Sequence, residues 1–124
     1  MLYSKTLLFI RSIYKSLHLL TPTFLFFIFK EITAEKTCLL KEVKEKYPEK
    51  TVWLWTGYDF EDFFSGDRFS WYAKKVLEYI DVVVDGKYMD NLKDLSLKYC
   101  GSTNQRVIDV KESFKENEIW LYED

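Results

Sequence analysis

Two short polar turns each follow an apolar run of the chain, and their residue types suit ligand binding. Thr56, Gly57 and Tyr58 follow one run, and Asp85 and Gly86 follow the other. Thr56 offers a hydroxyl, Gly57 lets a ligand approach the backbone closely, and Asp85 offers a carboxylate for an amine or a ribose hydroxyl. The same residue types also end strands as plain turns. The sequence therefore leaves two interpretations open at these positions, a small-molecule site and two structural turns.

A third polar run, Gly101–Arg106, precedes another apolar segment and is rich in hydrogen-bond donors. Asn104, Gln105 and Arg106 could bind a phosphate, a carboxylate or a loop of a partner protein, or form an ordinary loop with a solvated arginine. If the strand after this run is parallel to its neighbours, the run lies at the opposite edge of the sheet from Asp85. That arrangement would weaken the idea of one shared pocket.

Cysteine and histidine are too scarce for most metal chemistry. The chain holds two cysteines, Cys38 and Cys100, and one histidine, His18. A disulfide scaffold, an all-cysteine zinc or iron–sulfur site and a multi-histidine centre all need more. Each cysteine is expected to be a small buried hydrophobe. The residues themselves assign no metal ligand and no catalytic group.

The elements that position these turns alternate between helices and strands. Apolar side chains at helical spacing predict a helix over 39–47, which Pro48 ends. The run 51–55 is the continuous apolar kind that is buried on both faces of a parallel sheet. Together with a β-branched strand over 81–85 it predicts a strand–helix–strand unit. We further expect helices over 59–64 and 70–80, a short or irregular helix near 92–97, a strand over 106–110 and an edge strand over 118–122.

The fold class is therefore α/β, a partial parallel sheet with flanking helices. Ligands of such sheets lie beyond the carboxyl ends of the strands, where Thr56 and Asp85 stand. The net charge of −2 and the pI of about 5.5 argue against a protein that coats nucleic acid. Aromatic residues are unusually frequent at 19% of the chain.

The amino-terminal segment differs in composition from the rest of the chain. Residues 1–37 hold five Lys/Arg and two Asp/Glu, and 20 of their 37 side chains are hydrophobic. The apolar stretch 17–29 loosely resembles the core of a signal peptide, but Thr21-Pro22-Thr23 interrupts it. A membrane-spanning helix needs about 20 mainly apolar residues. A membrane role is therefore the weaker interpretation of this segment.

Several stretches of the chain resemble the anaerobic ribonucleoside-triphosphate reductase activating protein family, in the family's order and spacing. The most specific of them reads Gly-Ser-Thr-Asn-Gln-Arg-Val-Ile-Asp-Val. The resemblance covers residues 39–124, and the matching stretches are Leu40–Pro48, Val52–Tyr58, Ile80–Tyr88, Leu92–Lys98 and Gly101–Val110.

This resemblance implies a radical S-adenosylmethionine enzyme of the cytoplasm with a partial-barrel fold. Such an enzyme holds a [4Fe-4S] cluster through a C-x3-C-x2-C motif and uses S-adenosylmethionine to place a glycyl radical on its partner. The implied partner is the large subunit of anaerobic ribonucleoside-triphosphate reductase. Thr56, Gly57, Tyr58, Asp85 and Gly86 would line the cofactor side of the barrel. Asn104, Gln105 and Arg106 would hold the fold or dock the reductase.

The chain departs from the family at the cluster motif. It contains no C-x3-C-x2-C and no Gly-Gly-Glu-Pro, and residues 1–38 resemble nothing in the family. We therefore divide the chain into an apolar segment, 1–38, and the carboxyl-terminal part of an activase domain, 39–124. A mis-framed or replaced start would explain the boundary, and it predicts the missing motif in another reading frame of the DNA.

The expected consequence is a chain that cannot perform the radical reaction as written. The alternatives are a cluster-free remnant that docks on the reductase and a small membrane-associated protein. Loss of the first strands of a truncated barrel would also leave the strand 52–55 with an unpaired edge, which favours aggregation.

Overall fold

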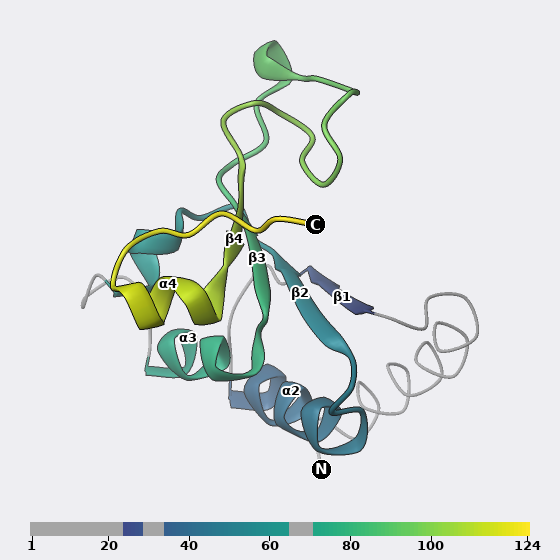
Figure 1. Ribbon diagram of the computed structural model, residues 1–124, viewed down its shortest axis with the longest axis vertical. Helices are drawn as coiled ribbons and strands as arrows, with labels where there is room; N and C mark the ends of the chain where they lie inside the picture. The colour runs from purple at the N-terminus through teal and green to yellow at the C-terminus, as the bar shows by residue number, and fades with distance from the viewer. Residues whose placement is uncertain (1–23, 29–33, 65–70) are drawn as a thin grey trace.

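The computed structural model describes residues 24–28, 34–64 and 71–124, which build one sheet and the helices packed against it (Figure 1). The strands are β1 (Phe24–Ile28), β2 (Thr51–Trp55), β3 (Val82–Asp85) and β4 (Arg106–Asp109). The α-helices are α2 (Ala34–Lys46), α3 (Trp71–Val76) and α4 (Val110–Glu116). Three 3₁₀ turns complete the set, η1 (Phe60–Phe64), η2 (Leu77–Tyr79) and η3 (Asp90–Leu92).

The sheet has the order β1-β2-β3-β4, and its strands are not all parallel. β1, β2 and β3 run parallel, and β4 runs antiparallel to β3. The expected unpaired edge of residues 52–55 is wrong, because β1 pairs with β2 in register from Phe24 opposite Thr51 to Ile28 opposite Trp55. The apolar run that resembled a targeting segment therefore supplies a strand.

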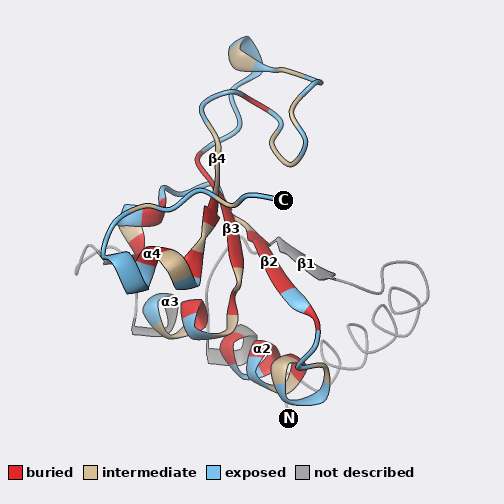
Figure 2. Cartoon of the chain, viewed as in Figure 1, coloured by how far each residue is buried: buried red, intermediate tan, exposed pale blue. Residues whose placement is uncertain are grey.

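Side chains alternate across β2 and β3, so the sheet buries both faces (Figure 2). Val52 and Leu54 of β2 and Val83 of β3 face a core that also takes in residues of α2, η1, η2 and α4. Trp53 of β2 and Val84 of β3 face the opposite side. The prediction of a strand buried on both faces is confirmed, because Val52, Trp53 and Leu54 are all buried.

The face of the sheet away from the helices is covered by aromatic residues. The Trp53 ring packs against those of Tyr99 and Tyr122, with centroid distances of 4.6 and 4.9 Å, and lies 5.8 Å from the ring of Trp55. The expected edge strand over 118–122 is reduced to a single bridge between Leu121 and Ile108. Residues 118–122 thus run along β4 and carry Tyr122 over this face.

Helix α4 was not expected from the apolar spacing. Its start is fixed by Asp109, whose side chain accepts a hydrogen bond from the Glu112 amide at 3.0 Å. It ends at Asn117, which adopts the left-handed conformation at φ 55°. The capping pattern of an aspartate three residues before a glutamate was the sequence signal for this helix. It explains why the strand expected over 106–110 stops at Asp109.

The α/β class and the positions of most elements agree with the sequence-based expectation. The helix expected over 70–80 divides into α3 and η2, and the helix expected over 59–64 is the 3₁₀ turn η1. Within the described ranges, no helix combines the length and the apolar character that a bilayer crossing needs. Most of the stretch 7–29 that raised a membrane role lies outside the described residues.

Asp81 ties the helices to the sheet just before β3. Its carboxylate accepts hydrogen bonds from the Val52 amide and the Lys44 ammonium, both at 2.7 Å, and pairs with Lys111 at 2.9 Å. Burial raises the pKa of this carboxyl, but the bonds from Lys44, Val52 and Lys111 outweigh it, so that the pKa lies below its ordinary value. The ionised form is therefore favoured by folding.

This gives a pH prediction. A carboxyl whose pKa is depressed by folding contributes stability above its unfolded pKa of about 3.9, and this contribution is lost as the pH falls further. Between pH 5 and pH 3 we expect the free energy of unfolding to fall less in the Asp81→Asn variant than in wild type, as measured by urea unfolding at each pH. Glu45→Gln, at an exposed position of α2, is the control and should leave the pH dependence unchanged. Equal pH dependence in wild type and Asp81→Asn would contradict the assignment.

Candidate functional site

The carboxyl end of β3 carries a buried carboxylate whose oxygens are fully engaged. Asp85 is 0% exposed, and its Oδ2 accepts a hydrogen bond from the Phe60 amide at 2.8 Å. Its Oδ1 accepts from the backbone amide and the Nε of Arg106, at 3.3 and 3.1 Å. Arg106 Nη2 adds a bond to Oδ2 at 2.5 Å, which makes the pair bidentate. Asp85 is thus an anchor for the chain around it.

Arg106 joins this anchor to the turn after β2. Its Nη1 and Nη2 donate to the two carboxylate oxygens of Glu61 in η1, at 3.1 and 2.7 Å. The hydrogen bond from Arg106 holds the pKa of Glu61 below its ordinary value, and the two carboxylates raise the pKa of Arg106 further. One guanidinium therefore pairs with two acidic groups, one at the end of β3 and one in η1.

The turn after β2 meets the turn after β3 through backbone hydrogen bonds. Thr56 is buried and donates its amide to the Val84 carbonyl at 3.0 Å, and its hydroxyl accepts from the Tyr58 amide at 3.3 Å. The Tyr58 carbonyl accepts from the Gly86 amide at 3.0 Å. A Cβ on Gly57 would meet nothing within 4 Å, so the space over this backbone is open. These residues lie together, as strand-end reasoning predicted.

Residues 86–105 connect β3 to β4 and are called the excursion below. Asn104 and Gln105 hold its two ends together. The Asn104 amide donates to the Lys87 carbonyl at 2.7 Å, and Gln105 Nε2 donates to the Gly86 carbonyl at 3.0 Å. Gln105 Oε1 accepts from the amides of Gly101 and Ser102, at 2.8 and 3.1 Å. Gly86 adopts φ 86°, a conformation that a residue with a Cβ would adopt only with backbone strain. The polar run thus fixes the base of the excursion.

The antiparallel direction of β4 brings all three polar runs to one edge of the sheet. A parallel strand would have placed Asn104, Gln105 and Arg106 at the far edge, whereas in the structure Arg106 is the register partner of Asp85. The sequence reasoning missed Phe60 and Glu61, which complete the site. Glu61 could have been found as an acidic side chain in the turn after β2 that is able to pair with the arginine of the polar run, Arg106.

A [4Fe-4S] cluster does not fit the described residues. Such a cluster takes its iron ligands from clustered cysteine thiolates. Cys38 is exposed on α2, and Cys100 is half-buried in the excursion with its Sγ 3.7 Å from the Gln105 carbonyl. Burial, assisted by the charge of Asp85, raises the pKa of the Cys100 thiol and disfavours the thiolate. Across the described ranges, no three His, Cys, Asp or Glu side chains gather as metal ligands.

Comparison with known proteins nonetheless matches the chain to a family described by an iron–sulfur cluster. The family described as "4Fe-4S single cluster domain" matches residues 30–108, which include β2, β3 and the polar runs. The anaerobic ribonucleoside-triphosphate reductase-activating protein of Enterobacteria phage T4 is 45% identical over 69 residues, which are 56% of this chain and 38% of that protein.

Bacterial proteins of the same name give similar matches. The one from Vibrio cholerae is 39% identical over 54% of this chain and 39% of its own length, and the one from Escherichia coli K12 is 36% identical over 56% and 41%. The matched region thus spans about two fifths of the length of these curated relatives. No solved structure matches the chain significantly. The family match covers more than half of the chain, and the chain therefore belongs to the 4Fe-4S single cluster domain family.

Proposed function

We propose that this chain carries the reductase-recognising part of an anaerobic ribonucleoside-triphosphate reductase-activating protein, and that these 124 residues bind the reductase large subunit without generating a radical on it. The similarity to proteins of that name carries the proposal, at 35–45% identity. The misfit between the described residues and a [4Fe-4S] cluster supports the second part of the proposal, that these residues generate no radical. The catalytic reaction of the family is not assigned to these residues.

The fold is proposed to be part of a radical S-adenosylmethionine type of barrel. The three parallel strands β1, β2 and β3 support this, because such a barrel begins from a parallel sheet with helices on one face. Thr56, Gly57 and Tyr58 are proposed to face the nucleoside ligand of such a fold, with the open space over Gly57 as the support. Asp85 then acts by positioning Gly86 and Arg106, because its own oxygens are already engaged.

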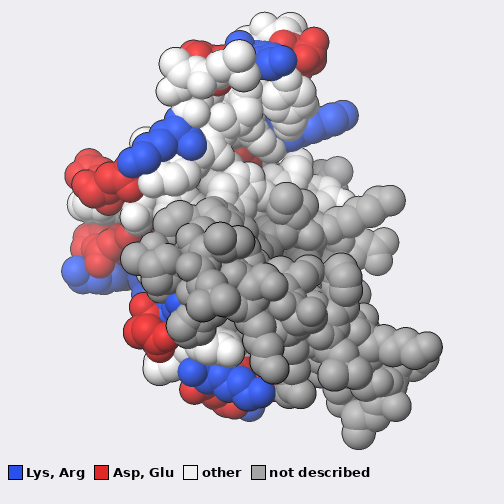
Figure 3. Space-filling view, turned by 90° about the vertical axis from the view of Figure 1, so that its right-hand side faces the viewer, with Lys and Arg blue, Asp and Glu red and all other residues white. Residues whose placement is uncertain are grey.

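The excursion between β3 and β4 is proposed as the contact surface for the reductase. It projects from the end of the sheet (Figure 1), and Figure 3 shows uncharged surface on it flanked by charged side chains. Tyr88, Met89 and Leu95 are exposed there, Leu95 by 88%. Aromatic and methionine side chains are enriched at protein interfaces, where a few apolar anchors dominate binding. The hydrogen bonds of Asn104 and Gln105 hold the base of the excursion in place.

Binding to the cognate reductase large subunit tests this proposal. The purified chain is expected to bind the immobilised subunit at micromolar concentration, and Leu95→Asp is expected to weaken binding about tenfold, or 1.4 kcal/mol. Leu121→Asp is the matched control, because Leu121 is 59% exposed but lies beside β4. No retention at micromolar concentration would sink the proposal. Equal effects of the two variants on binding would show that the excursion is not the contact surface.

A further inference from the structure

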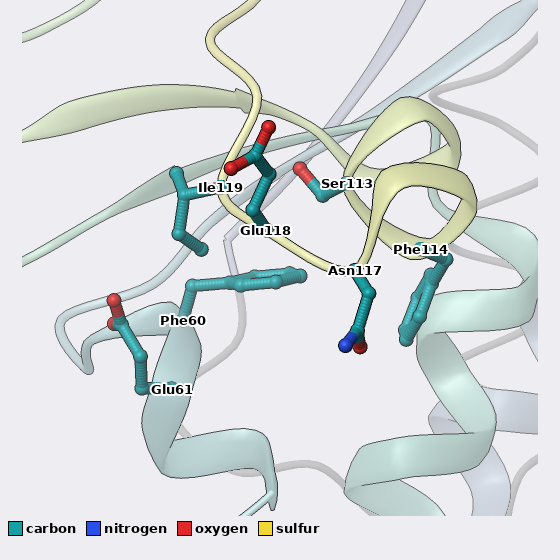
Figure 4. Close-up of a pocket in the computed structure, with 7 residues that line it drawn as sticks. All are labelled: Phe60, Glu61, Ser113, Phe114, Asn117, Glu118 and Ile119. Atoms are coloured by element: carbon teal, nitrogen blue, oxygen red, sulfur yellow. The ribbon is translucent and has the colours of Figure 1, made fainter.

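A cavity of about 290 Å³ lies between η1 and the end of α4. Figure 4 shows its lining residues, with the rings of Phe60 and Phe114 on two sides and the side-chain amide of Asn117 between them. The two ring centroids are 6.3 Å apart, and the rings are inclined by 60°. The volume is at the low end for ligand cavities, which suits a short group.

The chain around the cavity is held by hydrogen bonds that do not depend on a ligand. The hydroxyl of Ser113 donates to the Asp109 carbonyl at 2.6 Å and accepts from the Trp120 amide at 2.9 Å. The Glu118 amide donates to the Ser113 carbonyl at 3.2 Å. Phe60 is 4% exposed and fixed in the core. The cavity is therefore preformed, which lowers the cost of binding.

The charges at the cavity favour a cation. Among the described residues, its lining includes the carboxylates of Glu61 and Glu118 and no basic side chain. Glu61 shares the single guanidinium of Arg106 with Asp85, so that this group of three keeps a net negative charge. Glu118 forms no ion pair and the side chain of Asn117 no hydrogen bond with any described residue. An anion would be repelled here, whereas a cation gains a counter-charge from the exposed Glu118 carboxylate.

We infer that this cavity binds an organic cation, an ammonium or guanidinium group on a short apolar stem. The faces of Phe60 and Phe114 attract a cation and cover its stem. Glu118 supplies the opposite charge, and the Asn117 side-chain oxygen accepts a hydrogen bond from the cationic group. The cation could be a free amine or the side chain of a lysine or arginine on a partner protein. The inference is independent of the proposed function, which uses neither Phe114 nor Glu118.

Titration with n-butylammonium, followed by the shifts of the Asn117 amide resonances, tests the inference. The neutral analogue n-butanol is the first control, and acetyl-Gly-Lys-Gly-amide presents the same cation on a peptide. We expect saturable binding of both cations, and binding of n-butanol at least about fivefold weaker. Tighter binding of the peptide than of the free amine would identify a protein side chain as the natural ligand, and the reverse order a free amine.

Two variants separate a specific site from nonspecific attraction. Glu118→Gln keeps the shape of the side chain and is expected to weaken n-butylammonium binding at least about fivefold. Glu123→Gln removes an exposed carboxylate that does not line the cavity and should leave binding unchanged. Asn117→Gly preserves the left-handed end of α4 and should weaken the binding of the cation but not that of n-butanol. Equal affinities for n-butylammonium and n-butanol, or an unchanged affinity in Glu118→Gln, would overturn the inference.

Discussion

Arg106→Met is expected to lower the free energy of unfolding by about 3–5 kcal/mol, as measured by urea denaturation. The reason is the carboxylate that this change leaves behind. The side chain of Asp85 is 1% exposed, and its hydrogen bonds from Arg106 side-chain nitrogens would be lost while its desolvation remains. Glu61 would lose its partner as well, but it lies at the surface and contributes little.

A double variant separates the charge from the packing of Arg106. In Arg106→Met/Asp85→Asn the buried charge is gone, and we expect about 1–2 kcal/mol of the stability to return. Lys115→Met is the surface control, since Lys115 is 68% exposed, and should cost less than about 0.5 kcal/mol. A cost below 1 kcal/mol for Arg106→Met would show that Arg106 does not hold the edge of the sheet. The excursion that we propose to contact the reductase would then need another anchor.

Trp53→Ala is expected to cost about 3–5 kcal/mol, because it removes a large side chain from a packed layer. Trp53 is 2% exposed and contacts the rings of Trp55, Tyr99 and Tyr122. The change should also release residues 118–122, which cover this face of the sheet. Urea unfolding measures the loss of stability, and hydrogen exchange of the Tyr122 amide, which bonds the Val107 carbonyl at 2.9 Å, measures the release.

Trp120→Ala is the matched control for this change. Trp120 is 43% exposed and belongs to the same carboxyl-terminal segment, but it takes no part in the packing around Trp53. We expect it to cost about 1 kcal/mol or less and to leave exchange at Tyr122 slow. If the two variants were equally destabilising, the aromatic layer would not be the element that secures this face.

Local patterns were sufficient to predict the middle of the fold. The apolar run of β2 and the β-branched run of β3 specify strands without help from distant residues, and they place Thr56 and Asp85 at one edge of the sheet. The grouping of these turns follows from the parallel pairing of β2 and β3 alone. This is why the candidate residues could be named before the structure was known.

What could not be predicted depends on contacts between distant parts of the chain. The direction of β4 is set by the tertiary path of the excursion, and it decides whether Arg106 meets Asp85. The pairing of β1 with β2 brings into the sheet a segment that its apolar composition set apart from the rest of the chain. The roles of Glu61 and Phe60 arise only when η1 packs against the end of β3 and the start of β4, for which the sequence carries no periodic signal.

Anaerobic reconstitution with iron and sulfide tests the central claim most directly, namely that these residues keep the fold of the family without its cluster chemistry. After removal of unbound metal, we predict well under one iron per chain, with the same trace in Cys38→Ser and Cys100→Ser. About four irons and four sulfides per chain, lost in either cysteine variant, would contradict the account. That result would mean that Cys38 and Cys100 come together as cluster ligands, and the radical reaction would then return to this chain.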